Sequence, residues 1–171
     1  TPIIEAVRRD GDKALADFAN KFDRSPITAD QIRATPSEFA TARASVDQEL
    51  IETLKFAAGN IRHFHEKQMP ETLALHETHP GVLVGDRWNA IESVACYVPR
   101  GKGSFPSSVL MTAIPAKVAG VKKVIVITPP GPDGTVDPAT LVAAEIAGVS
   151  DVFKCGGAQG IAAVAYGTQT V

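Results

Sequence analysis

Two glycine-containing loops carry the side chains of this sequence that are best suited to binding a nucleotide. The first is Tyr97-Val-Pro-Arg-Gly-Lys-Gly-Ser-Phe-Pro106, and the second is Lys154-Cys-Gly-Gly-Ala-Gln-Gly160. Each follows an apolar run and precedes a helix-like segment, which is where open α/β sheets bind ligands. Backbone amides at such a turn can hold a pyrophosphate. Tyr97 could stack on a ligand or simply fill the end of the strand. Gln159 could hydrogen-bond to a ligand, although a solvated side chain is the more ordinary role of a lone glutamine.

Neither loop has the spacing of the usual dinucleotide fingerprint. In the first loop, Gly101 and Gly103 begin a G-x-G-x-x-G pattern, but Pro106 stands at the third glycine. In the second loop, Cys155 replaces the first glycine. The acidic residue that would hold a ribose about 20 positions onward is missing, because VIVIT is followed by two prolines. Without other information, each loop can equally be a plain strand-to-helix turn.

The remaining reactive side chains assemble no catalytic site. Cys155 at a helix start could be an activated thiolate, although a buried small residue is the more ordinary role of cysteine. Arg100 and Lys102 could meet a phosphate, or they could be solvated. The histidines do not chelate in pairs, since two on a helix and two near Pro80 point in different directions: His63, His65, His76 and His79. The sequence therefore predicts no metal site within this chain.

Composition excludes several classes of protein. A net charge of −2 gives no electrostatic case for a nucleic-acid partner or an anionic membrane, and no apolar run approaches the length that spans a bilayer. Two cysteines are too few for a disulfide framework, so we expect a reducing, cytoplasmic location. The chain begins Thr1-Pro2 and stops at Val171 after an alanine-rich segment, so we expect a piece of a longer protein.

The elements that must position these loops are helical in the first part of the chain and β-type in the next. Residues 1–72 read as a helical region that includes a long amphipathic helix over about residues 47–68. The expected core face of that helix is Leu50, Leu54, Ala57, Ile61 and Phe64. A short strand is possible around residues 31–33. Residues 73–96 hold short β-type runs, which we expect to form a small antiparallel arrangement leading into a strand over residues 93–98.

Residues 97–171 contain an internal repeat that predicts a parallel sheet. The segment Ala116-Lys-Val-Ala-Gly-Val-Lys-Lys-Val124 matches Ala144-Glu-Ile-Ala-Gly-Val-Ser-Asp-Val152, and each copy is a helix end, a capping glycine and a strand. One helix and one strand per repeat give parallel strands with right-handed crossovers. The fold class is therefore α/β: a helical N-terminal region and part of an incomplete Rossmann-like, doubly wound parallel sheet, with 97–171 as a truncated nucleotide-binding half.

The sequence resembles one known family over essentially its whole length. The runs YVPRGKGSFPSSVLMTAIPAKVAGVKKVIVITPP and AAEIAGVSDVFKCGGAQGIAAVAYGTQTV strongly resemble histidinol dehydrogenase. The upstream pieces RRDGDKALADFANKFD, NIRHFHEKQ and HPGVLVGDRWNAIESVACYVP are similar to that family in the same order.

This resemblance implies an enzyme that oxidises L-histidinol to L-histidine through L-histidinal, using two NAD and one zinc per site, in histidine biosynthesis. It also implies a homodimer whose active sites take residues from both chains. By motif match, Tyr97, Gln159 and, more weakly, Pro99 fall on NAD-contacting positions, and Ser107 matches a serine near the substrate. The family's zinc ligands and acid-base pair belong to segments that this chain does not contain, so the chain alone is expected to be inactive.

Two other functions stay open. A related dehydrogenase of the same superfamily could act on another small alcohol, such as a sulfonated diol, because the residues that select the substrate lie mostly outside this sequence. A non-catalytic nucleotide-binding or oligomerisation module is the alternative from a different class. Arg100 stands where many family members have glycine, which leaves its role open.

Overall fold

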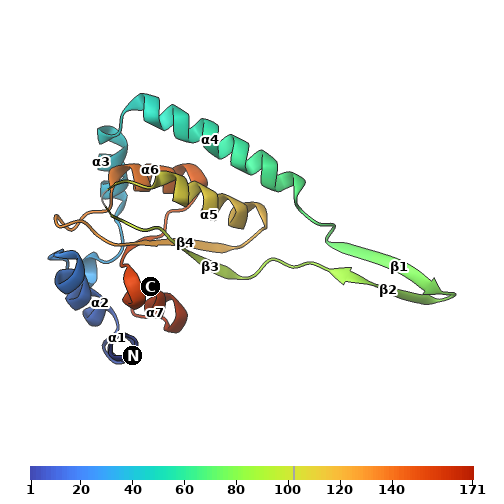
Figure 1. Cartoon of the computed structure of the whole chain (residues 1–171), viewed down its shortest axis with the longest axis horizontal. Coiled ribbons are helices and arrows are strands. Elements are labelled where there is room, and N and C mark those ends of the chain that lie inside the picture. The colour runs from blue at the N-terminus through green and yellow to red at the C-terminus, as the bar shows by residue number, and fades with distance from the viewer. Residues whose placement is uncertain (102) are drawn as a thin grey trace.

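The computed structural model describes residues 1–101 and 103–171, and its body is built on a three-stranded parallel sheet (Figure 1). The strands are β3 (Ser93–Tyr97), β4 (Lys123–Thr128) and β5 (Val152–Lys154), in the order β3-β4-β5. The repeat is thus confirmed as two helix–strand units. Gly120 and Gly148 end the two helices at φ angles of 83° and 77°, which glycine adopts without steric cost.

Helices cover both faces of this sheet, which explains why VIVIT is apolar without alternation. Helices α5 (Pro106–Val118) and α6 (Pro138–Ala147) lie over the face that carries Val124 and Val126. Helix α7 (Gly157–Tyr166) packs on the opposite face, against Ile125 and Ile127, together with α1 (Pro2–Asp10) and α2 (Asp12–Phe18). The two chain ends lie on this second face (Figure 1).

The helical N-terminal region wraps around the sheet and does not stand apart from it. A π-helical turn, η1 (Ala19–Asp23), and a 3-10 turn, η2 (Ala29–Gln31), lead into α3 (Pro36–Ser45) and α4 (Gln48–Lys67). Between η2 and α3, residues 32–34 run along the outer edge of β5. The Ala34 N–H donates to the Val152 carbonyl at 2.9 Å, and the Lys154 N–H donates to the Ile32 carbonyl at 2.7 Å. The short strand expected near residue 32 is present as this edge pairing.

The long helix α4 has the predicted bounds but a different buried face. Ile51, Leu54 and Ala58 are buried, whereas Leu50 and Phe64 are exposed, so the prediction was wrong for these two residues. The buried positions lie in the first half of the helix, which packs on α5. The second half runs past α5 toward the arm (Figure 1); Ala57 and Ile61 still pack against the core, whereas Phe56 and Phe64 are exposed.

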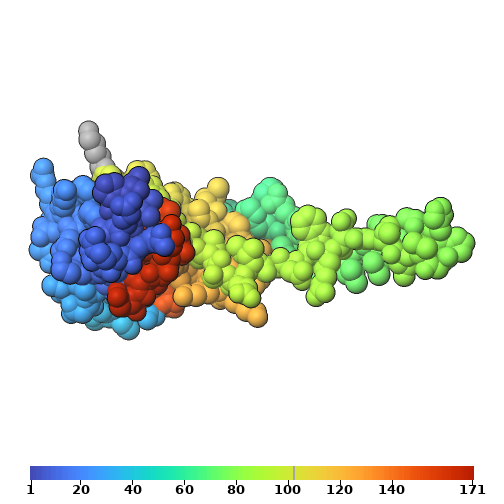
Figure 2. Space-filling model, turned by 90° about the horizontal axis from the view of Figure 1, so that it is seen from below, coloured from blue at the N-terminus to red at the C-terminus, as the bar shows by residue number. Residues whose placement is uncertain are grey.

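A two-stranded arm projects from the body (Figures 1 and 2). Strand β1 (Leu73–His79) pairs antiparallel with β2 (Val82–Arg87), as the sequence predicted, while the third β-type run joins the parallel sheet as β3. The arm exposes large apolar side chains on both strands: Leu73, Leu75, Val82, Leu83 and Val84. Within the described residues, no helix is long and apolar enough to cross a lipid bilayer.

Candidate functional site

The two loops picked out from the sequence meet at the carboxyl end of the sheet. Tyr97 is the last residue of β3, and its hydroxyl oxygen accepts a hydrogen bond from the backbone amide of Gly157 at 3.4 Å, although the two residues are 60 positions apart. Gly157 is the first residue of α7, two positions before Gln159. The structure therefore brings Tyr97 and the start of the Gln159 helix together, as a shared binding site requires.

Close packing explains the glycines of the second loop. A Cβ atom at Gly156 would overlap the ring of Pro129, which follows β4. Gly157 has a φ of 57°, a left-handed conformation that residues with a side chain rarely adopt. No side chain caps the start of α7, so its first amides remain available to a ligand apart from the long contact with Tyr97. These glycines serve a tight turn and leave a helix N-terminus open.

Gln159 is the buried polar side chain at the start of α7. It is only 4% exposed, and its amide group folds back over the α-carbon of Gly157. Within the described part of the chain, no hydrogen bond joins this amide to another residue. Its amide oxygen and nitrogen are nevertheless not among the fully buried atoms that lack a partner, so the place of Gln159 in the first turn of α7, and not an unmet hydrogen bond, makes it a candidate ligand contact.

The other predicted contacts lie on the same edge but are more exposed. Pro99 follows Tyr97 by two residues in the first loop, and Ser107 stands in the first turn of α5. Both are exposed and could face a ligand bound at the carboxyl end of the sheet. Lys102 lies outside the described residues. The site roles of Tyr97, Gln159, Pro99 and Ser107 remain predictions.

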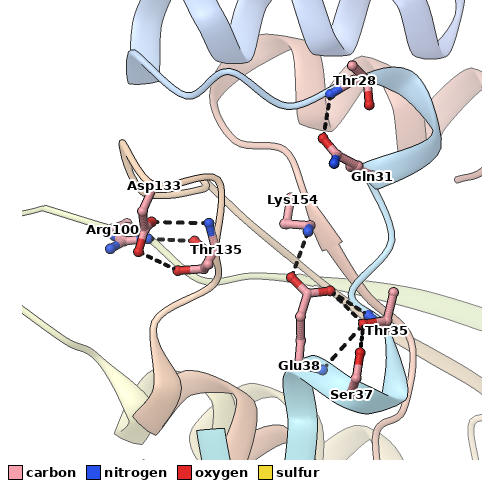
Figure 3. A network of polar contacts seen from close by, with 9 residues as sticks. All are labelled: Thr28, Gln31, Thr35, Ser37, Glu38, Arg100, Asp133, Thr135 and Lys154. Carbon is pink, nitrogen blue, oxygen red and sulfur yellow. Dashed lines mark hydrogen bonds and ion pairs between the residues drawn. The ribbon is translucent and has the colours of Figure 1, made fainter. Parts of the chain in front are cut away.

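Arg100 links two loops of this edge (Figure 3). Its Nη1 donates to the Thr135 carbonyl at 2.9 Å, and a Cβ atom at Gly131 would lie 2.5 Å from the same nitrogen. Hydrogen bonds from Thr135 hold the pKa of Asp133 below its ordinary value, and the charge of Arg100 lowers it further. Arg100 therefore ties the loop that follows β3 to the turn that follows β4.

A buried ion pair supports the neighbouring end of β5 (Figure 3). Lys154 Nζ lies 2.7 Å from Glu38 Oε1, and the side chains are 5% and 24% exposed. Glu38 also accepts a hydrogen bond from the backbone amide of Thr35 at 2.7 Å, in a capping box that starts α3. Burial alone would raise the pKa of Glu38, but the hydrogen bonds from Lys154 and Thr35 outweigh it and lower the pKa.

Cys155 is a buried small residue and not an activated thiolate. It is 2% exposed, and burial raises the pKa of its thiol to about 12, with further contributions from the charges of Asp12 and Asp23. A helix N-terminus can lower a thiol pKa, but burial raises it, and at Cys155 burial is the larger effect. The histidines lie on α4 and the arm, and no cluster of three or more metal-binding side chains exists among the described residues.

One candidate residue was missed by the sequence reasoning. Asp23, at the end of η1, has a carboxylate oxygen, Oδ2, that is buried without a hydrogen-bond partner among the described residues. No pattern in the sequence separates Asp23 from the surface aspartates near it, such as Asp17 and Asp30. Its importance depends on how the N-terminal region folds back onto the sheet.

Comparison with known proteins gives a consistent answer. A family model described as histidinol dehydrogenase matches residues 1–171. The chain is 58% identical to a histidinol dehydrogenase homolog of Colwellia psychrerythraea over 99% of its own length and 38% of that protein. It is 47% identical to a histidinol dehydrogenase of Synechocystis over 99% of its own length and 39% of that protein.

A solved structure agrees with the sequence comparisons. The crystal structure of histidinol dehydrogenase from Elizabethkingia anophelis superposes on this chain with a TM-score of 0.94 at 36% identity. The match covers 99% of this chain and 39% of that one. The chain thus spans less than half the length of the relatives it matches.

Proposed function

Because the chain belongs to the histidinol dehydrogenase family, we propose that it forms the NAD-binding edge of an enzyme that oxidises L-histidinol to L-histidine through L-histidinal. The reaction removes four electrons, which two NAD molecules accept as hydrides. In this proposal the chain's own residues bind and orient the cofactor. The base and the electrophile that alcohol oxidation needs come from outside the chain.

The observation that supports this role best is the convergence of Tyr97 and Gln159 at the start of α7. The hydroxyl of Tyr97 rests on the amide of Gly157 at 3.4 Å, which is a long and weak contact. An anionic phosphate would be a better partner for these amides, because the helix N-terminus carries partial positive charge. Tyr97 would then move aside and stack on the cofactor, and the amide of Gln159, in the first turn of α7, would hydrogen-bond to it.

Zinc, in this proposal, is held elsewhere. Within residues 1–101 and 103–171, the side chains offer no set of three potential ligands, and the histidines lie on exposed elements. The described residues therefore do not fit a zinc ion. For the substrate, Ser107 is the proposed contact, since it begins α5 on the same edge as Tyr97.

A homodimer and a cytoplasmic location complete the proposal. The exposed apolar side chains of the arm and of α4, which include Leu83, Phe56 and Phe64, form the kind of surface that associates with another protein surface. Cys96 and Cys155 are both free and buried, which suits a reducing compartment.

A second candidate function is the oxidation of a different small alcohol by the same chemistry. Four relatives named histidinol dehydrogenase homolog are 52–58% identical to this chain, whereas four named histidinol dehydrogenase are 47–48% identical. This difference favours the homolog group, whose substrate those names do not give. A sulfonated diol is the alternative that we propose.

The test uses the whole encoded protein with zinc, NAD and L-histidinol. We expect two NADH per histidinol, and NADH from another small alcohol but not from histidinol would favour the second candidate. Tyr97→Ala and Gln159→Ala should each weaken NAD binding about fivefold with little effect on kcat, because each removes about one hydrogen bond or stacking contact. Tyr166→Ala is the matched control, since Tyr166 is exposed at the far end of the same helix. Unchanged NAD affinity in both test variants would refute the assigned roles.

A further inference from the structure

The chain enters the carboxyl end of the sheet through an unusual turn. The π-helical turn η1 ends at Asp23, and Arg24 follows with φ 56° and ψ 30°, a left-handed conformation. Among the described residues, Arg24 is the one non-glycine residue with a positive φ. Both conformations cost free energy and persist only where the surrounding fold holds them in place. Both are frequent at functional sites.

This turn holds two polar side chains that lack partners. Oδ2 of Asp23 and Oγ of Ser25 are buried, and neither has a hydrogen-bond partner among the described residues; Ser25 is fully buried. Burial raises the pKa of Asp23, and the positive charge of Arg100 opposes that rise. The carboxylate of Glu38, by contrast, has two partners: the ammonium group of Lys154 and the backbone amide of Thr35. Asp23 as a whole is half-buried, and a buried carboxylate oxygen without a partner costs free energy unless a ligand supplies the missing donor.

Packing fixes where this turn lies. A Cβ atom at Gly134 would be 3.1 Å from Cγ2 of Ile27 and 4.0 Å from Oγ of Ser25, so the turn rests on the loop that follows β4. Arg100 is hydrogen-bonded to Thr135 in the same loop. The negative charge of Asp23 also raises the pKa of Cys155, which directly follows β5. Asp23 thus lies near the carboxyl ends of β4 and β5.

We propose that Asp23 binds the adenosine ribose of the cofactor, accepting hydrogen bonds from its 2′- and 3′-hydroxyls. This inference rests on the proposed function. In dinucleotide-binding sheets an acidic residue after the second strand holds the ribose, but here β4 ends in Thr128 and is followed by two prolines. Asp23 supplies the missing carboxylate from the N-terminal region, at the same edge of the sheet.

This placement makes Asp23 a determinant of cofactor choice. A carboxylate accepts hydrogen bonds from a free ribose and repels the 2′-phosphate of NADP. Arg100 is close enough for its charge to act on Asp23. If Asp23 became neutral, the 2′-phosphate would meet the guanidinium group without the opposing negative charge. The chain should therefore prefer NAD, and that preference should depend on Asp23.

The experiment measures the Kd values of NADH and NADPH by fluorescence titration of the whole encoded protein. Asp23→Asn should weaken NADH binding about tenfold, as expected for loss of hydrogen bonds to a charged group, and should leave NADPH binding unchanged or tighter. Asp17→Asn is the control, because Asp17 is an exposed aspartate of α2 whose partner is Lys13. If Asp23→Asn keeps the NADH affinity and the NADH-to-NADPH ratio within twofold of the parent, the inference is wrong.

A comparison of ligands tests the same contact without changing the protein. The parent should bind 2′-deoxy-NADH about fivefold more weakly than NADH, and equal binding would contradict the inference even if Asp23→Asn failed to fold. The two proposals can fail separately. Loss of affinity in Tyr97→Ala and Gln159→Ala, with none in Asp23→Asn, refutes the ribose contact alone. No binding of either nucleotide to the parent refutes both.

Discussion

Replacing Lys154 with methionine should destabilise the protein by about 2–3 kcal/mol, because it leaves the Glu38 carboxylate buried without its charged partner. Removing one member of a fully buried pair costs about 3–5 kcal/mol. The loss here is smaller for two reasons: Glu38 is 24% exposed, and it keeps its hydrogen bond from the Thr35 amide at 2.7 Å. Methionine has a similar length, so little packing is lost.

Urea unfolding at pH 7 measures this cost, and a double-mutant cycle isolates the pair. Adding Glu38→Gln to Lys154→Met should recover part of the loss, with a coupling energy of about 2 kcal/mol between the two positions. Lys13→Met is the control, since Lys13 pairs with Asp17 at 2.7 Å but its side chain is 75% exposed. That change should cost less than about 0.5 kcal/mol. Equal losses at Lys154 and Lys13 would show that burial does not strengthen the pair.

The pH dependence gives a second check on the same reasoning. The pKa of Glu38 is lowered in the folded protein, so its contribution is present above the unfolded pKa of about 4.3 and is lost as the pH falls through the folded pKa. The stability difference between the parent and Lys154→Met should therefore shrink below about pH 4. A difference that is constant from pH 7 to pH 3 would refute the argument.

Three further predictions concern the junction of α1 and α2, the exposed face of α4 and the buried thiol of Cys155. Gly11→Ala should lower the stability by about 2 kcal/mol, because Gly11 has a φ of 56° and its Cβ would overlap the side chain of Gln169. Gly59→Ala, in open space on α4, should instead stabilise the protein by up to about 1 kcal/mol in thermal unfolding; equal effects would contradict this. Cys155 should react with a thiol reagent at pH 8 only as fast as the protein unfolds, because its pKa is about 12, and rapid labelling of the native protein would show an accessible thiolate.

Local patterns in the sequence were sufficient to predict the parallel sheet. The capping glycines and the apolar run VIVIT depend on contacts within one helix–strand unit, and the structure has both units where the repeat placed them. The face of α4 was harder to predict. Leu50 and Phe64 fit a helical stripe as well as Ile51 does, and the choice between them depends on how far α5 extends beneath the helix.

In the candidate site, too, some residues could be predicted from local sequence patterns and others could not. Tyr97 ends β3 and Gln159 lies in the first turn of the helix that follows β5, so their meeting at one edge is a consequence of parallel topology. Asp23 reaches that edge only because the N-terminal region folds back over 100 residues of sequence, and nothing local to it indicates this. The partner of Lys154 could not be predicted either, since Glu38 is 116 positions away.

The crossing of α7 to the second face of the sheet decides the direction in which the sheet can grow. Residues 32–34 already occupy the outer edge of β5, so within the described part of the three-stranded sheet the free edge is that of β3. A right-handed crossover through α7 would deliver a parallel strand to that same edge. A strand added parallel to β3 at that edge would end beside Tyr97, the last residue of β3. Extension of the sheet and completion of the candidate site would become one event.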